Sequence, residues 1–125
     1  MKVLTIKQPW AELIIDGYKA YEFRSWKTKY RGKILIHAGM SLENDMVERF
    51  KDYHLEYTMG AIIGEAILED CILVDKEFND QLRSIDPIVY GKSNHVETYA
   101  WKLTNIVKYD NPIPIKGKLG LWNYK

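Results

Sequence analysis

Apolar and polar side chains alternate most regularly between positions 99 and 108. The apolar members of the alternation are Tyr99, Trp101, Leu103 and Val107. Side chains two residues apart leave the same face of a strand, so this segment is predicted to be a strand with one buried face and one basic face. The sequence Asn111–Pro114 should end it, because proline cannot donate to a strand ladder.

Further strands are expected wherever short apolar stretches rich in branched and aromatic residues recur. They cover positions 3–6, 18–26, 32–38 and 60–74. In the last of these, apolar side chains sharing one face run from Ile62 to Val74 and are interrupted at Asp70. That segment is therefore predicted to be one long strand or a bent pair of strands.

Three short helices are predicted between the strands. Pro9 begins the first, over 11–16, and Gly17 ends it. Ser41 is the expected N-cap of an acidic helix over 43–53. A third helix is expected over 77–82, followed by a polar loop over 84–95.

This order of elements predicts the α+β class. Five or six strands without a regular strand–helix alternation argue against a doubly wound parallel sheet. A small, mostly antiparallel β-barrel with short helices at its ends fits better, and such barrels bind ligands at an open mouth. No linker or repeat divides the sequence, so residues 1–125 are expected to form a single domain.

The composition is that of an ordinary folded domain. The 125 residues are 46% apolar, and eighteen Lys and Arg nearly balance seventeen Asp and Glu, which excludes a disordered chain. No apolar run approaches the roughly 20 residues of a membrane span, and no signal peptide is recognised, so no membrane partner is expected. The single cysteine, Cys71, favours a reducing compartment, and a cytoplasmic location is predicted.

The charge is balanced in total but not along the chain. Positions 41–86 carry a net charge of −8, which leaves +9 for the rest. Cations are densest over 19–33, where only Glu22 opposes them and aromatic residues such as Trp26 and Tyr30 are interleaved. A polyanion would find both phosphate contacts and stacking surfaces there, whereas the plainer interpretation is a solvated basic surface with the rings in the core.

The first 39 residues contain a specific set of motifs. The pattern G-x-K-x-x-E-x-R is present as Gly17, Lys19, Glu22 and Arg24. It is preceded by Q-P-W-A at 8–11, followed by R-S-W at 24–26 and Y-R-G at 30–32, and the chain closes with P-I-K-G at 114–117 and Trp122. In these motifs the chain resembles the ASCH domain, the homology domain of the activating signal cointegrator, over nearly its whole length.

The resemblance implies a fold and a class of ligand. ASCH domains are similar in fold to the PUA domain, a β-barrel of RNA-binding and RNA-modifying proteins. RNA, another single-stranded nucleic acid or a nucleotide is therefore the expected partner, with no cofactor. Both binding and catalysis are known in the family, so whether this chain is an enzyme stays open.

The motif residues have side chains suited to an anionic ligand. Glu22 and Arg24 lie two apart on a predicted strand and share a face, and Lys19 follows the helix end, so the three can meet in one cleft. Arg24 would grip two oxygens and Lys19 would act as a point charge. A salt bridge that only joins helix and strand is the alternative. The further candidate contacts are Gln8, Trp26, Lys29, Arg31 and Lys116.

The second hypothesis is a small amidohydrolase, because some compact ASCH proteins resemble amidohydrolases that act on N4-acylated cytidine. By that resemblance Lys19 would be a catalytic base, and Glu22 would handle the proton. Those enzymes have a threonine where this chain has Glu22, so the hydroxyl is missing. No metal site is expected, because His37, His54 and His95 lack ligand spacing, and Cys71 in an apolar strand is not a predicted nucleophile.

Overall fold

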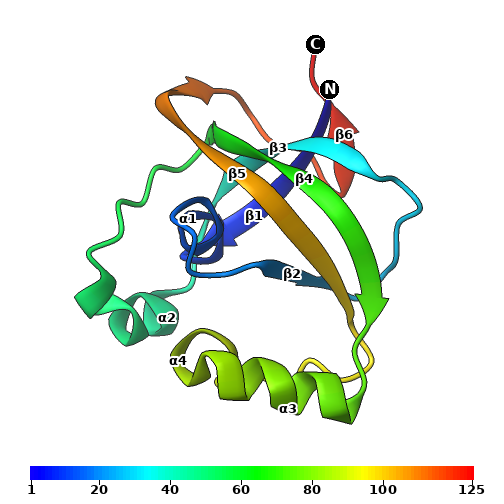
Figure 1. Cartoon of the computed structure of the whole chain (residues 1–125). Helices are drawn as coiled ribbons and strands as arrows, with labels where there is room; N and C mark the ends of the chain where they lie inside the picture. The colour runs from blue at the N-terminus through cyan, green and yellow to red at the C-terminus, as the bar shows by residue number, and fades with distance from the viewer.

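A computed structural model describes all of residues 1–125. It is an α+β fold with one six-stranded sheet, whose strand order is β2-β5-β4-β3-β1-β6 (Figure 1). The strands are β1 (Lys2–Gln8), β2 (Tyr21–Arg24), β3 (Gly32–Leu42), β4 (Ala61–Leu73), β5 (Tyr99–Pro114) and β6 (Leu121–Asn123). The helices are α1 (Trp10–Ile15), α2 (Asn44–Arg49), the 3₁₀ turn η1 (Lys51–Tyr53), α3 (Lys76–Ile85) and α4 (Pro87–Tyr90).

The sheet is mostly antiparallel, as predicted, but it does not close into a barrel. Only β1 and β3 run parallel. The edge strands are short: the four-residue β2 pairs with β5 alone, and the three-residue β6 pairs with β1 alone. No ladder joins these two edges, so the prediction of a barrel is wrong in this respect.

Strand β5 continues through the sequence that was expected to end it. Ala61 of β4 pairs with Pro114 and Ile62 with Ile113. On its other side, β5 pairs with β2 only as far as Lys102, so the segment around Pro112 is an edge. Proline is tolerated on an edge because its missing donor would have faced no partner strand.

Helix α1 lies against the concave side of the curled sheet (Figure 1). Five consecutive residues, Ala11–Ile15, are buried. Ile14 and Ile15 pack among the sheet residues, whereas Leu13 faces a second cluster formed with α2, α3 and α4. Gly17 ends this part of the chain as predicted, at a φ of 87° that side chains other than glycine rarely adopt.

The later helices differ in extent from the prediction. Ser41 belongs to β3, Glu43 is the N-cap of α2, and the expected 43–53 helix is divided into α2 and η1. The polar loop contains α4, which Asp86 caps by accepting hydrogen bonds from the backbone of Ile88 and Val89. Asp86 followed by Pro87 is itself a helix-start signal.

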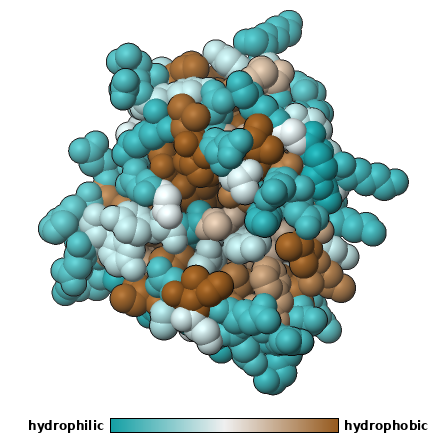
Figure 2. Space-filling view, in the orientation of Figure 1, coloured by the Kyte–Doolittle hydropathy of each residue, from teal (hydrophilic) through white to brown (hydrophobic).

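The surface and core follow the sequence pattern. Trp101 is buried, as expected, and so is Trp122. Apolar side chains gather towards the centre of the face shown in Figure 2, while hydrophilic ones form most of its outline. The two chain ends lie together, joined by hydrogen bonds between Met1 and Tyr124 (Figure 1). No helix combines the length and apolarity required to cross a membrane.

Candidate functional site

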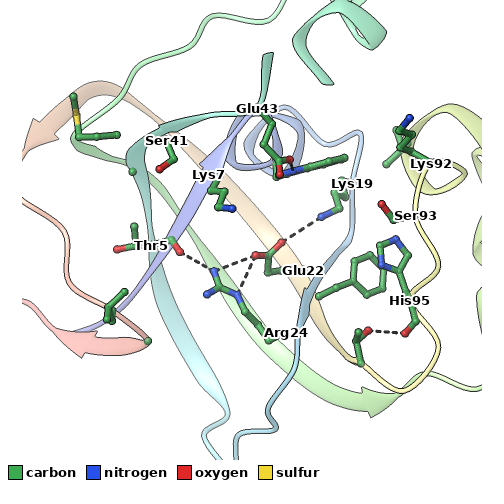
Figure 3. Close-up of a pocket in the computed structure, with 18 of the residues that line it drawn as sticks. Thr5, Lys7, Lys19, Glu22, Arg24, Ser41, Glu43, Lys92, Ser93 and His95 are labelled. Carbon is green, nitrogen blue, oxygen red and sulfur yellow. Dashed lines mark hydrogen bonds and ion pairs between the residues drawn. The ribbon is translucent and has the colours of Figure 1, made fainter. Parts of the chain in front are cut away.

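A cavity of about 630 Å³ opens between the unpaired edges of the sheet, a volume typical of small-molecule sites. One wall comes from β1 and β2, and the opposite walls come from the end of β3, the 92–98 loop and the segment before β6 (Figure 3). Its polar and charged lining side chains include Thr5, Lys7, Lys19, Glu22, Arg24, Ser41, Glu43, Lys92, Ser93, His95 and Lys118. We call it the first cavity.

Lys19 reaches the first cavity because of the turn that follows α1. Its backbone N–H donates to the carbonyl of Leu13, which folds the chain back against the helix after Gly17. Its side chain is only 4% exposed, and its Nζ lies 3.3 Å from Glu22 Oε1, over the rings of Trp10 and Phe23. Burial lowers the pKa of Lys19, and the charge of Glu22 opposes this shift.

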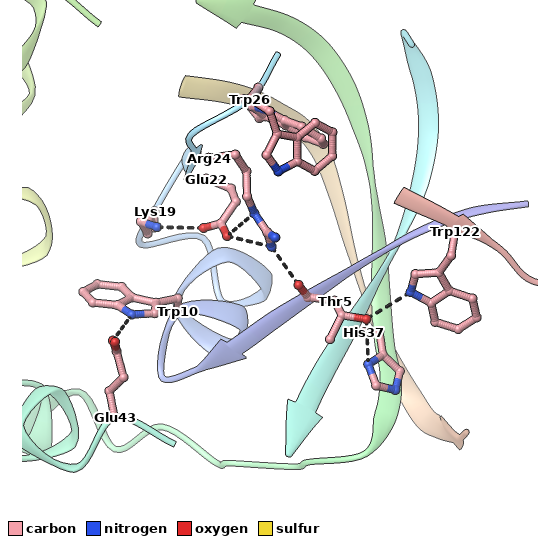
Figure 4. A network of polar contacts seen from close by, with 10 residues as sticks. Thr5, Trp10, Lys19, Glu22, Arg24, Trp26, His37, Glu43 and Trp122 are labelled. Atoms are coloured by element: carbon pink, nitrogen blue, oxygen red, sulfur yellow. Dashed lines mark hydrogen bonds and ion pairs between the residues drawn. The ribbon is translucent and has the colours of Figure 1, made fainter. Parts of the chain in front are cut away.

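Glu22 and Arg24 leave the same face of β2, as predicted. Arg24 Nε donates to Glu22 Oε2 at 3.1 Å, and Arg24 Nη2 donates to the carbonyl oxygen of Thr5 at 2.7 Å. Glu22 thus lies between Lys19 and Arg24, and the three form one charged cluster (Figure 4). Arg24 Nη1 has no protein partner, so one edge of the guanidinium is free.

Cations outnumber carboxylates in the first cavity. Five Lys and Arg residues line it, against Glu22 and Glu43. Lys7, Lys92 and Lys118 form no ion pair, whereas Glu43 accepts a hydrogen bond from the indole N–H of Trp10. With His95 neutral, the lining carries a net charge of +3, which attracts an anion.

Aromatic rings lie among these charges. The imidazole of His95 stacks on Phe23, with ring centroids 3.7 Å apart and planes within 7°. Burial, followed by the charge of Lys19, lowers the pKa of His95 to about 4, so it is neutral at pH 7. Trp10, Phe23 and His95 all line the first cavity, and the ammonium of Lys19 lies over the rings of Trp10 and Phe23.

Thr5 connects this cluster to a second buried network (Figure 4). Its hydroxyl accepts from the indole N–H of Trp122 at 3.0 Å and lies 3.3 Å from His37 Nδ1. His37 Nε2 lies 2.7 Å from the carbonyl oxygen of Ile115, which only accepts, so Nε2 carries the proton. A Cβ on Gly117 would lie 2.6 Å from the His37 ring, so only glycine fits there.

Comparisons with known proteins agree with these motifs. The family profile of the ASCH domain matches residues 4–113. The chain belongs to the ASCH domain family. It is 31% identical to human activating signal cointegrator 1 and 30% identical to the mouse protein, covering 95% of this chain but 21% of each relative, so it spans about a fifth of their length.

Solved ASCH structures share the fold. A crystal structure of ASCH from Zymomonas mobilis matches with a TM-score of 0.57 and 19% identity, over 90% of this chain and 72% of that one. Its S128A mutant matches with a TM-score of 0.57 and 20% identity, over 91% and 73%. At these identities the likeness concerns the fold.

The structure brings together the three ASCH motif residues Lys19, Glu22 and Arg24 in the first cavity. The prediction that Gln8 contacts the ligand needs correction. The side chain of Gln8 is fully buried; it donates to the carbonyl of Thr58 and accepts from the N–H of Glu12, so it is not available to a ligand. It fixes the start of α1 instead.

The candidates that follow β2 lie outside the first cavity. Trp26 packs edge-on against Trp101, and Arg31 bonds to the carbonyls of Thr28 and Tyr30. Lys29 is exposed in the same loop. Lys116 lines a neighbouring cavity rather than this one.

Several lining residues were not among the sequence candidates, namely Lys7, Trp10, Lys92, His95 and Lys118. Trp10 is half-buried at the cavity wall. Lys7 and Trp10 flank the Q-P dipeptide, and Lys118 follows the closing P-I-K-G motif, so motif proximity was a usable signal for these three. Nothing in the polar loop singles out Lys92 or His95.

Proposed function

We propose that this chain binds single-stranded nucleic acid, with one nucleotide held in the first cavity. RNA as the strand and the cytoplasm as the location are parts of the same proposal. The observation that carries it is the net positive charge around the Lys19–Glu22–Arg24 cluster, together with lysines that have no protein counter-ion. Membership of the ASCH family, with its PUA-like fold, supports a nucleic-acid-related module.

Each part of a nucleotide has a matching group in the first cavity. The free edge of Arg24 and the unpaired Lys7, Lys92 and Lys118 suit phosphate oxygens. The ring of Trp10 and the His95–Phe23 pair suit a base, whose stacking contributes about 1–3 kcal/mol. Because stacking accepts any base, this arrangement favours binding with little sequence preference.

The test is fluorescence anisotropy with labelled eight-nucleotide RNA and DNA strands at several salt concentrations. The logarithm of the affinity is expected to fall with the logarithm of the salt concentration, at a slope of about −0.7 per neutralised phosphate. Lys92→Ala should weaken binding about threefold, as expected for one exposed ion pair. Lys125→Ala is the matched control, because Lys125 lines neither this cavity nor its neighbour.

Three results separate the hypotheses about the surface. A salt-independent affinity, or equal losses from Lys92→Ala and Lys125→Ala, contradicts the proposed site. A larger loss from Lys29→Ala than from Lys92→Ala places the strand on the 27–31 loop instead.

The second candidate function is hydrolysis of an N4-acylated cytidine-like nucleoside. The observation that favours it is Lys19 itself: it is buried beside a carboxylate at the cavity wall, and burial lowers its pKa towards the range of a general base. Incubation with N4-acetylcytidine tests it by the release of acetate. Turnover that Lys19→Met abolishes supports catalysis, and no turnover by the wild-type chain refutes it.

A further inference from the structure

A second cavity of about 600 Å³ adjoins the first. Thr5, Gly39, Met40, Lys118 and Leu119 line both. Thr5 forms the junction: its carbonyl oxygen accepts from Arg24 on one side, and its hydroxyl contacts His37 on the other. The two cavities therefore adjoin and share a wall, which includes Thr5 of β1.

The second cavity is more uniformly basic than the first. Its charged side chains are Lys116 and Lys118, and no carboxylate lines it. Neither lysine forms an ion pair or a hydrogen bond within the chain, although Lys118 Nζ lies 5.9 Å from the ring centre of Trp122. A polyanion that extends from the first cavity into the second would thus meet Lys118 at the shared wall and Lys116 beyond it.

The shared wall also exposes apolar side chains. Met40 is 75% exposed and Leu119 is 99% exposed, and both belong to the lining of both cavities. An exposed Met and an exposed Leu beside unpaired lysines offer an adaptable apolar contact for a base together with contacts for its phosphate.

From this placement we infer that the second cavity is a separate subsite for the adjacent nucleotide of the same strand, with Lys116 contacting its phosphate. This inference rests on the proposed function, because it takes the first cavity as the site of the first nucleotide. The substrate class is accordingly a strand of two or more nucleotides, not a free mononucleotide. Lys118 at the shared wall contacts the phosphate between the two.

The test compares the length dependence of binding in the wild-type chain, Lys116→Glu and the control Lys125→Glu. The probes are uridine 5′-monophosphate and uridine oligomers of two, four and eight nucleotides, with the corresponding deoxythymidine series. In the wild-type chain the affinity should rise at the step from one to two nucleotides. Lys116→Glu should remove most of this gain, lower the salt slope by about 0.7, and leave the mononucleotide affinity unchanged.

The outcomes are distinguishable from failure of the proposed function. If oligomers bind and Lys116→Glu behaves like Lys125→Glu, the second subsite is refuted while the first cavity stands. Equal losses for mononucleotide and oligomers also refute it, because Lys116 would then act on the first nucleotide. If neither probe series binds the wild-type chain, the proposed function itself is refuted. Both substitutions are at exposed positions, and thermal unfolding checks that the fold is retained.

Discussion

Removing the carboxylate of Glu22 tests whether the charged cluster is an interdependent unit. Glu22 is the acceptor for both Lys19 and Arg24, and its side chain is 10% exposed. In Glu22→Gln, the buried ammonium of Lys19 would lose its counter-ion while the shape of the site is retained. Breaking one side of a buried pair costs about 3–5 kcal/mol, so we expect a loss of about 3 kcal/mol in the free energy of unfolding at pH 7.

The loss should depend on pH and on Lys19. Burial already lowers the pKa of Lys19, and without Glu22 the pKa falls further. Neutral Lys19 needs no counter-ion, so the deficit of Glu22→Gln should shrink as the pH rises from 7 to 10. The double variant Lys19→Met/Glu22→Gln should recover about 2 kcal/mol, because a methionine packs well against the rings of Trp10 and Phe23.

The assay is urea unfolding followed by tryptophan fluorescence and circular dichroism. Glu48→Gln is the matched control: its ion pair with Lys51 is exposed, so the change should stay below about 0.5 kcal/mol. The reasoning is refuted if Glu22→Gln is as mild as this control, or if the double variant is no more stable than Glu22→Gln alone.

Three further predictions concern pH and packing. Burial raises the pKa of Glu12 to about 7, so the contribution of Glu12 to stability is complete below about pH 4.5 and is lost as the pH rises through 7. Between pH 5 and pH 8, the free energy of unfolding in urea should therefore decrease by up to about 3 kcal/mol more in the wild-type chain than in Glu12→Gln. Equal decreases in the two chains would contradict this. Gly117→Ala should lower the free energy of unfolding by about 1–3 kcal/mol in thermal unfolding, because the methyl group of the alanine would meet the His37 ring. An unchanged melting temperature would mean that the ring moves freely. Oligonucleotide affinity should stay constant between pH 5.5 and 8, since His95 has a pKa of about 4, and a midpoint near 6.5 would show that His95 is more exposed than described.

The part of the site that could be predicted from the sequence is the part built locally. Lys19, Glu22 and Arg24 come from one turn and one strand, so the alternation of side chains on β2 suffices to bring them together. The opposite walls come from residues such as His95 and Lys118, more than 70 positions further along the chain. Their placement depends on how the sheet orders its strands, which local patterns do not specify.

Gln8 is a second residue whose environment could not be predicted from the local sequence. A polar residue before a helix start is often available to a ligand, and the sequence near the Q-P-W-A motif favoured that interpretation. Its amide instead donates to the carbonyl of Thr58, fifty residues away, and accepts from the N–H of Glu12. A buried amide needs such partners, and only the tertiary structure reveals that it has them.

The open sheet explains why Arg24 serves the fold and the cavity together. The edge strand β2 and the end of β1 face each other without a backbone ladder, and β6 pairs with β1 only from Lys2 to Leu4. The carbonyl oxygen of Thr5 lies just beyond that pairing and accepts from Arg24. A side chain therefore joins the two edges where a closed barrel would have strand hydrogen bonds, and the space left open beside it is the first cavity. Any substitution of Arg24 consequently alters both the joining of the edges and the positive charge of the cavity, which is why the exposed Lys92 and Lys116 are the more informative positions for measuring binding.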